Sequence, residues 1–183
     1  YGSGNLNAIA NIYKSLKIPF CISSSPLEIS KAKKLILPGV GSFDVASTAL
    51  RDGGFFNYDF LSNDNTVVGI CLGLHLMCKG SQEGNLNGLG LFNEKAIDFK
   101  GRRSPYVHLG WSKVESKIDE LSGRHYFCHR YFVENSKLSK SSLIQEGLNI
   151  SNVINHGKFW GIQSHPERSG KSGQKLLSWI LRQ

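Results

Sequence analysis

The sequence has no long apolar run, few cysteines and a shortage of acidic residues, and each shortage excludes a class of protein. No stretch approaches the roughly 20 consecutive apolar residues that a helix needs to cross a bilayer, so we expect no membrane segment. The 4 cysteines are scattered and do not reach the density of a disulfide-stabilised secreted domain. We therefore expect a protein of the reducing cytoplasm.

Acidic residues number 14 against 22 lysines and arginines, which gives a net charge of +8. The basic residues occur in small separate groups, and no stripe of basic residues interleaved with aromatic ones is present. Because such a stripe is typical of nucleic-acid binding, we expect no nucleic-acid partner. An anionic small molecule or the acidic face of a partner protein would use the same charge.

The first half of the chain has the pattern of an α/β domain. Apolar spacing predicts helices at residues 6–16, 27–32 and 44–50, and strands at 19–23, 34–37 and 67–70. This alternation favours a parallel sheet covered by helices on both faces. We expect residues 1–183 to form one domain that lacks its opening strand, because the first residues resemble the turn after a strand.

The second half predicts strands without long helices between them, at residues 95–99, 106–114, 125–134 and 143–146. Residues 152–154 and 158–163 flank an Asn-His-Gly sequence, which is typical of a hairpin turn. A closing amphipathic helix is expected at 173–182, with Ser172 as its cap. The predicted fold is an open, mostly parallel twisted sheet with helices on both faces and an added antiparallel part.

The chemistry centres on Cys71, which follows the buried strand at 67–70 in the sequence Gly-Ile-Cys-Leu-Gly. An apolar run suited to a helix ending near Gly80 comes next. A strand, a tight turn and a helix form a nucleophile elbow, in which the turn exposes the nucleophile. The helix start favours a thiolate, and the N–H of Leu72 is placed to stabilise an oxyanion.

Two other interpretations of Cys71 remain open from this motif alone. A cysteine at the end of a core strand can be a small hydrophobic residue. A metal site is the other interpretation, because Cys71, His75 and Cys78 share one helical face. No Cys-x-x-Cys pair or fourth ligand accompanies them, so we expect no metal.

A second signal is His165-Pro166-Glu167, which ends the last predicted strand. A carboxylate at Glu167 could bind one imidazole nitrogen of His165 and leave the other facing a nucleophile. A cysteine, a histidine and a glutamate arranged in this way attack amides through a thioester. The alternative is an ordinary polar turn. The loop at 38–41 also has two interpretations: it is an ordinary turn, or it presents backbone N–H donors beside Cys71.

Several motifs together resemble the class I, triad-type glutamine amidotransferases. They are Tyr-Gly-Ser-Gly-Asn-Leu at 1–6, Pro-Gly-Val-Gly-Ser-Phe at 38–43, Gly-Ile-Cys-Leu-Gly at 69–73 and His-Pro-Glu-Arg-Ser at 165–169. The segments at 108–111 and 126–131 make the chain most similar to the glutaminase subunit of imidazole glycerol phosphate synthase. The resemblance covers nearly the whole chain.

The resemblance implies a mechanism and a partner. Cys71 would attack the side-chain amide of glutamine, His165 would act as base and then acid, and Glu167 would orient His165. Backbone N–H groups of Leu72 and Val40 would form the oxyanion hole. A (β/α)₈-barrel subunit would form a heterodimer with this chain and use the ammonia to make imidazole glycerol phosphate in histidine biosynthesis. No cofactor is implied.

The resemblance also implies a glutamine pocket, in which Glu83 binds the ammonium group. The other residues implied in this pocket are Gly39, Gly41, Gly73, His75, His129, Arg130 and Tyr131. The sequence departs from the family where glutamine is replaced by His75, serine by Arg130 and an aromatic residue by Ser164. These departures keep two alternatives open: an ammonia-supplying paralogue for a surface-polysaccharide sugar amidation enzyme, and a cysteine hydrolase of the same superfold.

The remaining histidines are expected to have no part in the chemistry. We expect His125 and His156 to be solvated, and His108 to line the contact with the partner.

Overall fold

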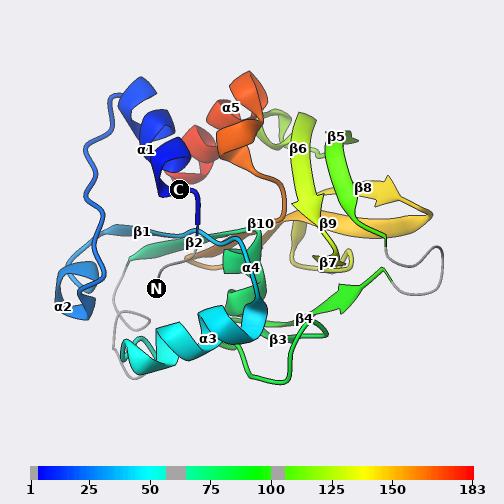
Figure 1. The fold of residues 1–183 in the computed structure, drawn as a ribbon. Coiled ribbons are helices and arrows are strands. Elements are labelled where there is room, and N and C mark those ends of the chain that lie inside the picture. Colours follow the sequence, from blue (N-terminus) through cyan, green and yellow to red (C-terminus); the bar gives the residue numbers. More distant parts are fainter. Residues whose placement is uncertain (1–3, 57–64, 100–105) are drawn as a thin grey trace.

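A computed structural model describes residues 4–56, 65–99 and 106–183, and its centre is a mixed five-stranded sheet (Figure 1). The strand order is β1 (Lys34–Leu37), β2 (Thr66–Ile70), β10 (Phe159–Ile162), β9 (Leu148–His156) and β8 (Ser139–Gln145). The first three strands are parallel, and β9 and β8 continue the sheet with antiparallel pairing. The predicted α/β fold with an added antiparallel part is confirmed.

Helices cover both faces of this sheet (Figure 1). On one face lie α1 (Leu6–Ser15) and α5 (Gly170–Ile180), and on the other α3 (Phe43–Asp52) and α4 (Leu72–Met77), with the short α2 (Pro26–Ile29) near β1. Helix α1 is capped by Asn5, whose side chain accepts a hydrogen bond from the N–H of Ala8 at 3.3 Å. In the part of the chain that the structure describes, no helix is long and apolar enough to cross a membrane.

Apolar side chains from both helical layers meet the sheet. Ile9 of α1 and Leu176 of α5 belong to one core cluster with Val68 of β2. A second cluster joins Phe43 of α3 to Leu76 of α4 on the other face. Because β2 is sandwiched between these layers, the residue that follows it is fixed from both sides.

Smaller sheets complete the fold beside the carboxyl end of β2. They are formed by β3 (Cys78–Ser81), β4 (Phe92–Asp98) and β7 (Tyr131–Phe132), and by the antiparallel pair β5 (His108–Val114) and β6 (Gly123–His129). Two single-turn helices, η2 (Asp119–Leu121) and η3 (Pro166–Arg168), flank α5. The hairpin predicted around residues 155–157 is the turn between β9 and β10.

Three predicted elements differ in the structure. Residues 19–23 do not form a strand, because none of the described strands pairs with them. The helix after Cys71 ends at Met77 rather than near Gly80, since the next residues turn into β3 and pair with β4. Helix α5 begins at Gly170, so Ser172 lies inside it and does not cap it.

The two histidines expected to be solvated have different surroundings. His156 is exposed in the hairpin turn, as predicted. His125 is fully buried, and the prediction for it was wrong. Its strand, β6, is covered by α5, so a polar residue in the middle of β6 faces the interior. Burial accordingly lowers the pKa of His125.

Candidate active site

Cys71 occupies a strained turn between β2 and α4. Its backbone has φ +53° and ψ −108°, a region that residues other than glycine rarely adopt. Such a conformation costs about 1–3 kcal/mol and persists only where its surroundings enforce it. Here the N–H of Cys71 donates to the carbonyl of Ile162 at 2.7 Å, which ties the turn to β10. The geometry is that of the predicted nucleophile elbow.

The glycines around Cys71 are required by close backbone contacts. A Cβ at Gly73 would lie 1.9 Å from the carbonyl oxygen of Leu37, and one at Gly69 would lie 2.6 Å from the backbone of Gly73. A Cβ at Gly39 would likewise lie 2.6 Å from the N atom of Gly73. The loop after β1 therefore packs directly against the elbow, where its backbone donors were expected.

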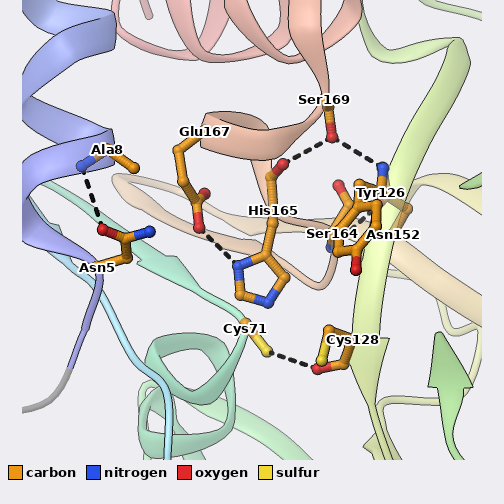
Figure 2. Close-up of polar contacts among 10 residues, drawn as sticks. All are labelled: Asn5, Ala8, Cys71, Tyr126, Cys128, Asn152, Ser164, His165, Glu167 and Ser169. Carbon is orange, nitrogen blue, oxygen red and sulfur yellow. Dashed lines mark hydrogen bonds and ion pairs between the residues drawn. The ribbon is translucent and has the colours of Figure 1, made fainter. Parts of the chain in front are cut away.

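His165 and Glu167 form a buried pair facing Cys71 (Figure 2). The Nδ1 atom of His165 lies 2.7 Å from Oε1 of Glu167, and the two side chains are only 4% and 3% exposed. Because the carboxylate accepts the Nδ1 hydrogen, Nε2 remains available to exchange a proton with the sulfur. The three residues singled out in the sequence are brought together by the ends of β2 and β10.

The pKa of His165 reflects this neighbourhood. Burial alone lowers it, but hydrogen bonds to Cys71 and Glu167, together with their charges, raise it to about 10. A proton therefore resides readily on His165 when the sulfur is ionised. The Sγ atom of Cys71 also lies 3.9 Å from the carbonyl oxygen of Cys128, a long and weak contact compared with the pairing to His165.

The backbone around His165 is fixed by two side chains that the sequence analysis missed. The Ser169 hydroxyl donates to the carbonyl of His165 at 2.6 Å and accepts from the N–H of Tyr126 at 2.9 Å. The Oδ1 atom of Asn152 accepts from the N–H of Ser164 at 3.1 Å. Ser169 closes the His-Pro-Glu-Arg-Ser motif, and that position was the only available signal for it.

Glu83 and Arg130 lie near each other beside the site. Arg130 donates from Nε and Nη2 to the two carboxylate oxygens of Asp98, at 3.2 and 2.8 Å. Burial raises the pKa of Glu83, while a hydrogen bond from the backbone of Phe43 and the charge of Arg130 act to lower it. The opposite charges of Glu83 and Arg130 are therefore close enough to influence each other, and neither residue is fully buried.

His75 is buried and hydrogen-bonded beneath the elbow. Its Nε2 atom lies 3.0 Å from Oε1 of Gln163, and since that oxygen can only accept, Nε2 carries the hydrogen. Burial lowers the pKa of His75 to about 4, an effect that the bond to Gln163 only partly offsets. His75 is therefore neutral at physiological pH.

His129 uses both ring nitrogens within the protein. Its Nδ1 donates to the carbonyl of Tyr131 at 2.9 Å, which leaves Nε2 as an acceptor for Nδ1 of His108 at 3.1 Å. The Nε2 atom of His108 in turn lies 2.8 Å from the hydroxyl of Ser112, which must donate to it. This chain of hydrogen bonds ties the β5–β6 pair to β7 and engages both ring nitrogens of His129.

The expected oxyanion donors lie on the two segments that meet at the elbow. Leu72 is the first residue of α4, and Val40 lies on the exposed surface of the loop after β1. Gly41, next to Val40, has φ +108° and open space around it. The role of the Val40 N–H as an oxyanion donor stays a prediction.

The metal interpretation gains no support from the described ranges, which contain no group of three or more side chains suited to holding a metal. Cys78 belongs to β3 rather than to α4, and its thiol donates to the carbonyl of Leu74 at 3.3 Å. The Nε2 atom of His75 is hydrogen-bonded to Gln163. His75 and Cys78, the two ligands that would join Cys71 in a metal site, therefore both make hydrogen bonds to other residues.

Comparison with known proteins agrees with this geometry. Residues 5–182 match the family described as glutamine amidotransferase class-I. A Methanococcus maripaludis protein named imidazole glycerol phosphate synthase subunit HisH 2 is 36% identical, over 100% of this chain and 96% of the relative. Subunit HisH of Bdellovibrio bacteriovorus is 35% identical, over 97% of this chain and 94% of its own.

Solved structures share the fold at low identity. A crystal structure of a glutamine amidotransferase superposes with a TM-score of 0.79 at 16% identity, covering 98% of this chain and 94% of that chain. A glutamine amidotransferase from Thermotoga maritima gives 0.60 at 14% identity, over 95% and 76% of the two chains. From the family match and the full-length relatives, the chain belongs to the class-I glutamine amidotransferases.

Proposed function

We propose that this chain is the glutaminase subunit of an imidazole glycerol phosphate synthase. It would hydrolyse glutamine to glutamate and ammonia and pass the ammonia to a synthase subunit. The observation that carries the proposal is Cys71 in its elbow, opposite the buried pair of His165 and Glu167. The relatives named as HisH subunits, which match the chain over nearly its full length, support the pathway.

The first half of the reaction forms a thioester. The sulfur of Cys71 attacks the side-chain amide carbon of glutamine while its proton moves to Nε2 of His165. Backbone N–H groups of Leu72 and of the loop at Val40 would stabilise the oxyanion. His165 then gives the proton to the departing nitrogen, and ammonia leaves a γ-glutamyl thioester on Cys71.

The second half releases glutamate. His165, now neutral at Nε2, takes a proton from water as the water attacks the thioester carbon. The tetrahedral intermediate collapses, the sulfur leaves, and His165 returns the proton to it. Glu167 keeps Nδ1 protonated throughout, so the same imidazole nitrogen faces the sulfur and the water in turn.

The glutamine head group would lie between the charged residues beside the elbow. The pocket that we propose contains Glu83 for the ammonium group, and its walls include Gly39, Gly41, Gly73, His75, Arg130 and Tyr131. His75 would support the pocket without touching the substrate, because its ring is buried and hydrogen-bonded to Gln163.

A partner surface is available close to the nucleophile. Val107, Leu109 and Trp111 on and before β5 are exposed large hydrophobic residues, at 47%, 65% and 48% of their full surface. Leu109 pairs in register with Cys128, whose carbonyl faces Cys71. We propose that this apolar stripe docks the (β/α)₈-barrel synthase subunit in a heterodimer, so that ammonia leaves the site into the partner. An acidic partner face would complement the net charge of +8.

The cytoplasm is the compartment that we propose for this reaction. The nucleophile must stay a free thiol, and all four cysteines are unpaired in the structure. The mechanism uses only side chains and backbone groups of the chain and calls for no cofactor.

The experiment measures glutamate release from glutamine by this chain, alone and with the synthase barrel and its ribotide substrate. We expect strong stimulation by the barrel, and loss of that stimulation in Trp111→Glu. Ile144→Glu is the matched control, because Ile144 is an exposed apolar residue on β8. Stimulation only by a surface-polysaccharide amidation enzyme would show that the protein supplies ammonia to that pathway. Turnover of other amides in place of glutamine would show that it is a different cysteine hydrolase.

A further inference from the structure

Asp44 ties the loop that carries Glu83 to the beginning of α3. It lies in the first turn of this helix and accepts hydrogen bonds from the backbone N–H groups of Asn85 and Leu86, each at 3.1 Å. The two bonds use different oxygens of the carboxylate, so the side chain is held at both. Because a charged acceptor strengthens a hydrogen bond, Asp44 is a firm anchor for the residues that follow Glu83.

The loop also packs directly against this carboxylate. A Cβ at Gly84, the residue next to Glu83, would lie 2.0 Å from Oδ1 of Asp44, so only glycine allows this approach. On the other side, the backbone N–H of Glu83 donates to the hydroxyl of Ser81 at 3.0 Å. The backbone of Glu83 is thus held from both directions, by Ser81 before it and by Asp44 after it.

Glu83 in turn binds the same end of α3. Burial raises the pKa of Glu83, and a hydrogen bond from the backbone of Phe43, the first residue of α3, acts to lower it. The first N–H groups of a helix have no partner inside the helix. Within the described part of the chain, the side chain of Ser42 makes no capping hydrogen bond to α3. A carboxylate from another segment therefore takes this role, and the helix and the loop exchange hydrogen bonds in both directions.

This end of α3 is also the end of the loop expected to supply an oxyanion donor. Residues 38–42 connect β1 to α3. The loop is packed against the elbow at its beginning, where a Cβ at Gly39 would lie 2.6 Å from the N atom of Gly73. Its other end continues into Phe43, which is bonded to Glu83. The mutual contact of Asp44 and Glu83 therefore fixes the proposed ammonium-binding residue relative to the elbow.

We propose that Asp44 is a positioning residue for glutamine, because it holds the Glu83 loop against the start of α3 and so orients the Glu83 carboxylate toward the substrate ammonium group. The proposal rests on the proposed function, since it concerns binding of the same glutamine whose amide Cys71 attacks. Both oxygens of Asp44 accept backbone N–H groups, whereas the Glu83 carboxylate keeps lone pairs for the ammonium group. Asp44 acts through Glu83 and does not touch the substrate.

The test is a double-mutant cycle on Asp44 and Glu83, with glutamine binding as the readout. Glutamine is titrated as a protectant of Cys71 against iodoacetamide, and the labelling of Cys71 is followed by peptide mass spectrometry. This readout needs no turnover and no partner. Glu83→Ala is expected to weaken protection by about tenfold or more, the usual effect of losing a hydrogen bond to a charged group. Asp44→Ala is expected to weaken it by about tenfold, because the carboxylate of Glu83 is no longer held in place.

The double variant separates a residue that acts through Glu83 from one that acts independently. Residues that work as a unit have non-additive effects. In a chain that already carries Glu83→Ala, we expect Asp44→Ala to weaken protection by less than about threefold more. A further loss of about tenfold, equal to the effect of Asp44→Ala alone, would overturn the proposal. So would an Asp44→Ala chain that binds glutamine as well as the unmodified protein.

Asp44→Asn separates the hydrogen bonds of Asp44 from its charge. The amide keeps one acceptor oxygen for the two N–H groups, so glutamine binding is expected to lie between that of the unmodified chain and that of Asp44→Ala. An Asp44→Asn chain as weak as Asp44→Ala would assign the effect to the charge and overturn the proposal. If Asp44→Ala is poorly folded, the cycle is carried by Asp44→Asn.

Ser47→Ala is the matched control for a loss of stability. The hydroxyl of Ser47 donates to the carbonyl of Asn87 at 2.7 Å, so it also joins α3 to this loop, but farther along the chain from Glu83. We expect a lower melting temperature with unchanged protection by glutamine. If Ser47→Ala weakens protection as much as Asp44→Ala, the role of Asp44 is merely structural and the proposal is wrong.

Turnover with the synthase barrel gives a second readout. Asp44→Ala is expected to raise KM for glutamine about tenfold and to leave kcat within about threefold, since binding is weakened while Cys71, His165 and Glu167 are untouched. A fall in kcat at constant KM would overturn the proposal.

Failure of this proposal and failure of the proposed function are distinguishable. If glutamine protects Cys71 in the unmodified chain but the effects of the two substitutions add, the Asp44 proposal is wrong and the proposed function stands. If glutamine neither protects Cys71 nor is hydrolysed, the proposed function is wrong and the Asp44 proposal falls with it.

Discussion

The carboxylate of Glu167 lies 2.7 Å from the imidazole of His165, and the pair is almost completely shielded from water. Replacing Glu167 by glutamine keeps the size of the side chain and removes its charge. The amide can then present an N–H to Nδ1 and favour the wrong tautomer of His165. We expect the kcat of glutamine hydrolysis in Glu167→Gln to fall about 10²- to 10⁴-fold, with a small change in KM. A kcat within a factor of three of the unmodified protein would exclude this role.

The same pair makes stability depend on pH. The pKa of His165 is raised to about 10, whereas it is about 6.5 in an unfolded chain. Below about pH 6.5 both states hold the proton and the full stabilisation is present. Between about pH 6.5 and 10 only the folded state keeps it, so the free energy of unfolding from this group falls as pH rises.

Denaturant titrations at pH 6, 8 and 10 measure this effect. We expect the loss of stability over this range to be smaller in Glu167→Gln, because the carboxylate no longer supports the imidazolium. Equal slopes in the two proteins would show that Glu167 does not raise the pKa of His165.

Gly73 tests the packing of the elbow. A Cβ there would lie 1.9 Å from the carbonyl oxygen of Leu37, so Gly73→Ala must displace β1 or α4. We expect a destabilisation of about 3 kcal/mol or more, together with loss of activity. Gly80→Ala is the matched control, since its nearest heavy atom would be the Leu86 carbonyl oxygen at 3.6 Å. Thermal unfolding of both variants decides the matter, and equal melting temperatures would contradict the close contact.

His75 is expected to make the protein sensitive to acid. Its pKa is lowered to about 4, so the folded state keeps it neutral while the unfolded state gains a proton below about pH 6.5. The stabilisation is present above about pH 6.5 and is lost as pH falls toward 4. His75→Gln, which has no titrating group, is expected to remove up to about 3 kcal/mol of this loss. If the acid-unfolding curves of the two proteins coincide, His75 is not the group responsible.

The sequence predicted the proximity of the three candidate residues better than their surroundings. Cys71, His165 and Glu167 could be found because short motifs report local geometry, a turn after a strand and two side chains leaving another strand. The hydrogen bonds that Ser169 accepts from Tyr126 and that Asn152 accepts from Ser164 could not, because they depend on contacts between different segments of the chain. Alternating strand patterns do not reveal which strands pair or which face a helix will cover.

Two wrong predictions have the same origin. His125 looked like the solvated start of a strand, but α5 covers β6 at that point. The helix after Cys71 looked longer because its apolar run continues to Cys78, although that residue already pairs with Phe92 of β4. In both cases tertiary packing overrode the local pattern. The bond between Arg130 and Asp98 also joins segments distant in the chain, β4 and the end of β6, and the sequence pattern does not reveal it.

The most direct test of the account is the capture of the thioester on Cys71. The chain is mixed with glutamine and the synthase barrel, quenched in acid within the first turnover, and digested for mass spectrometry. We expect the peptide containing Cys71 to gain the mass of a γ-glutamyl group, and this adduct to be absent from Cys71→Ala. Glutamate formed without any adduct on Cys71, or formed equally by Cys71→Ala, would contradict nucleophilic catalysis by this residue.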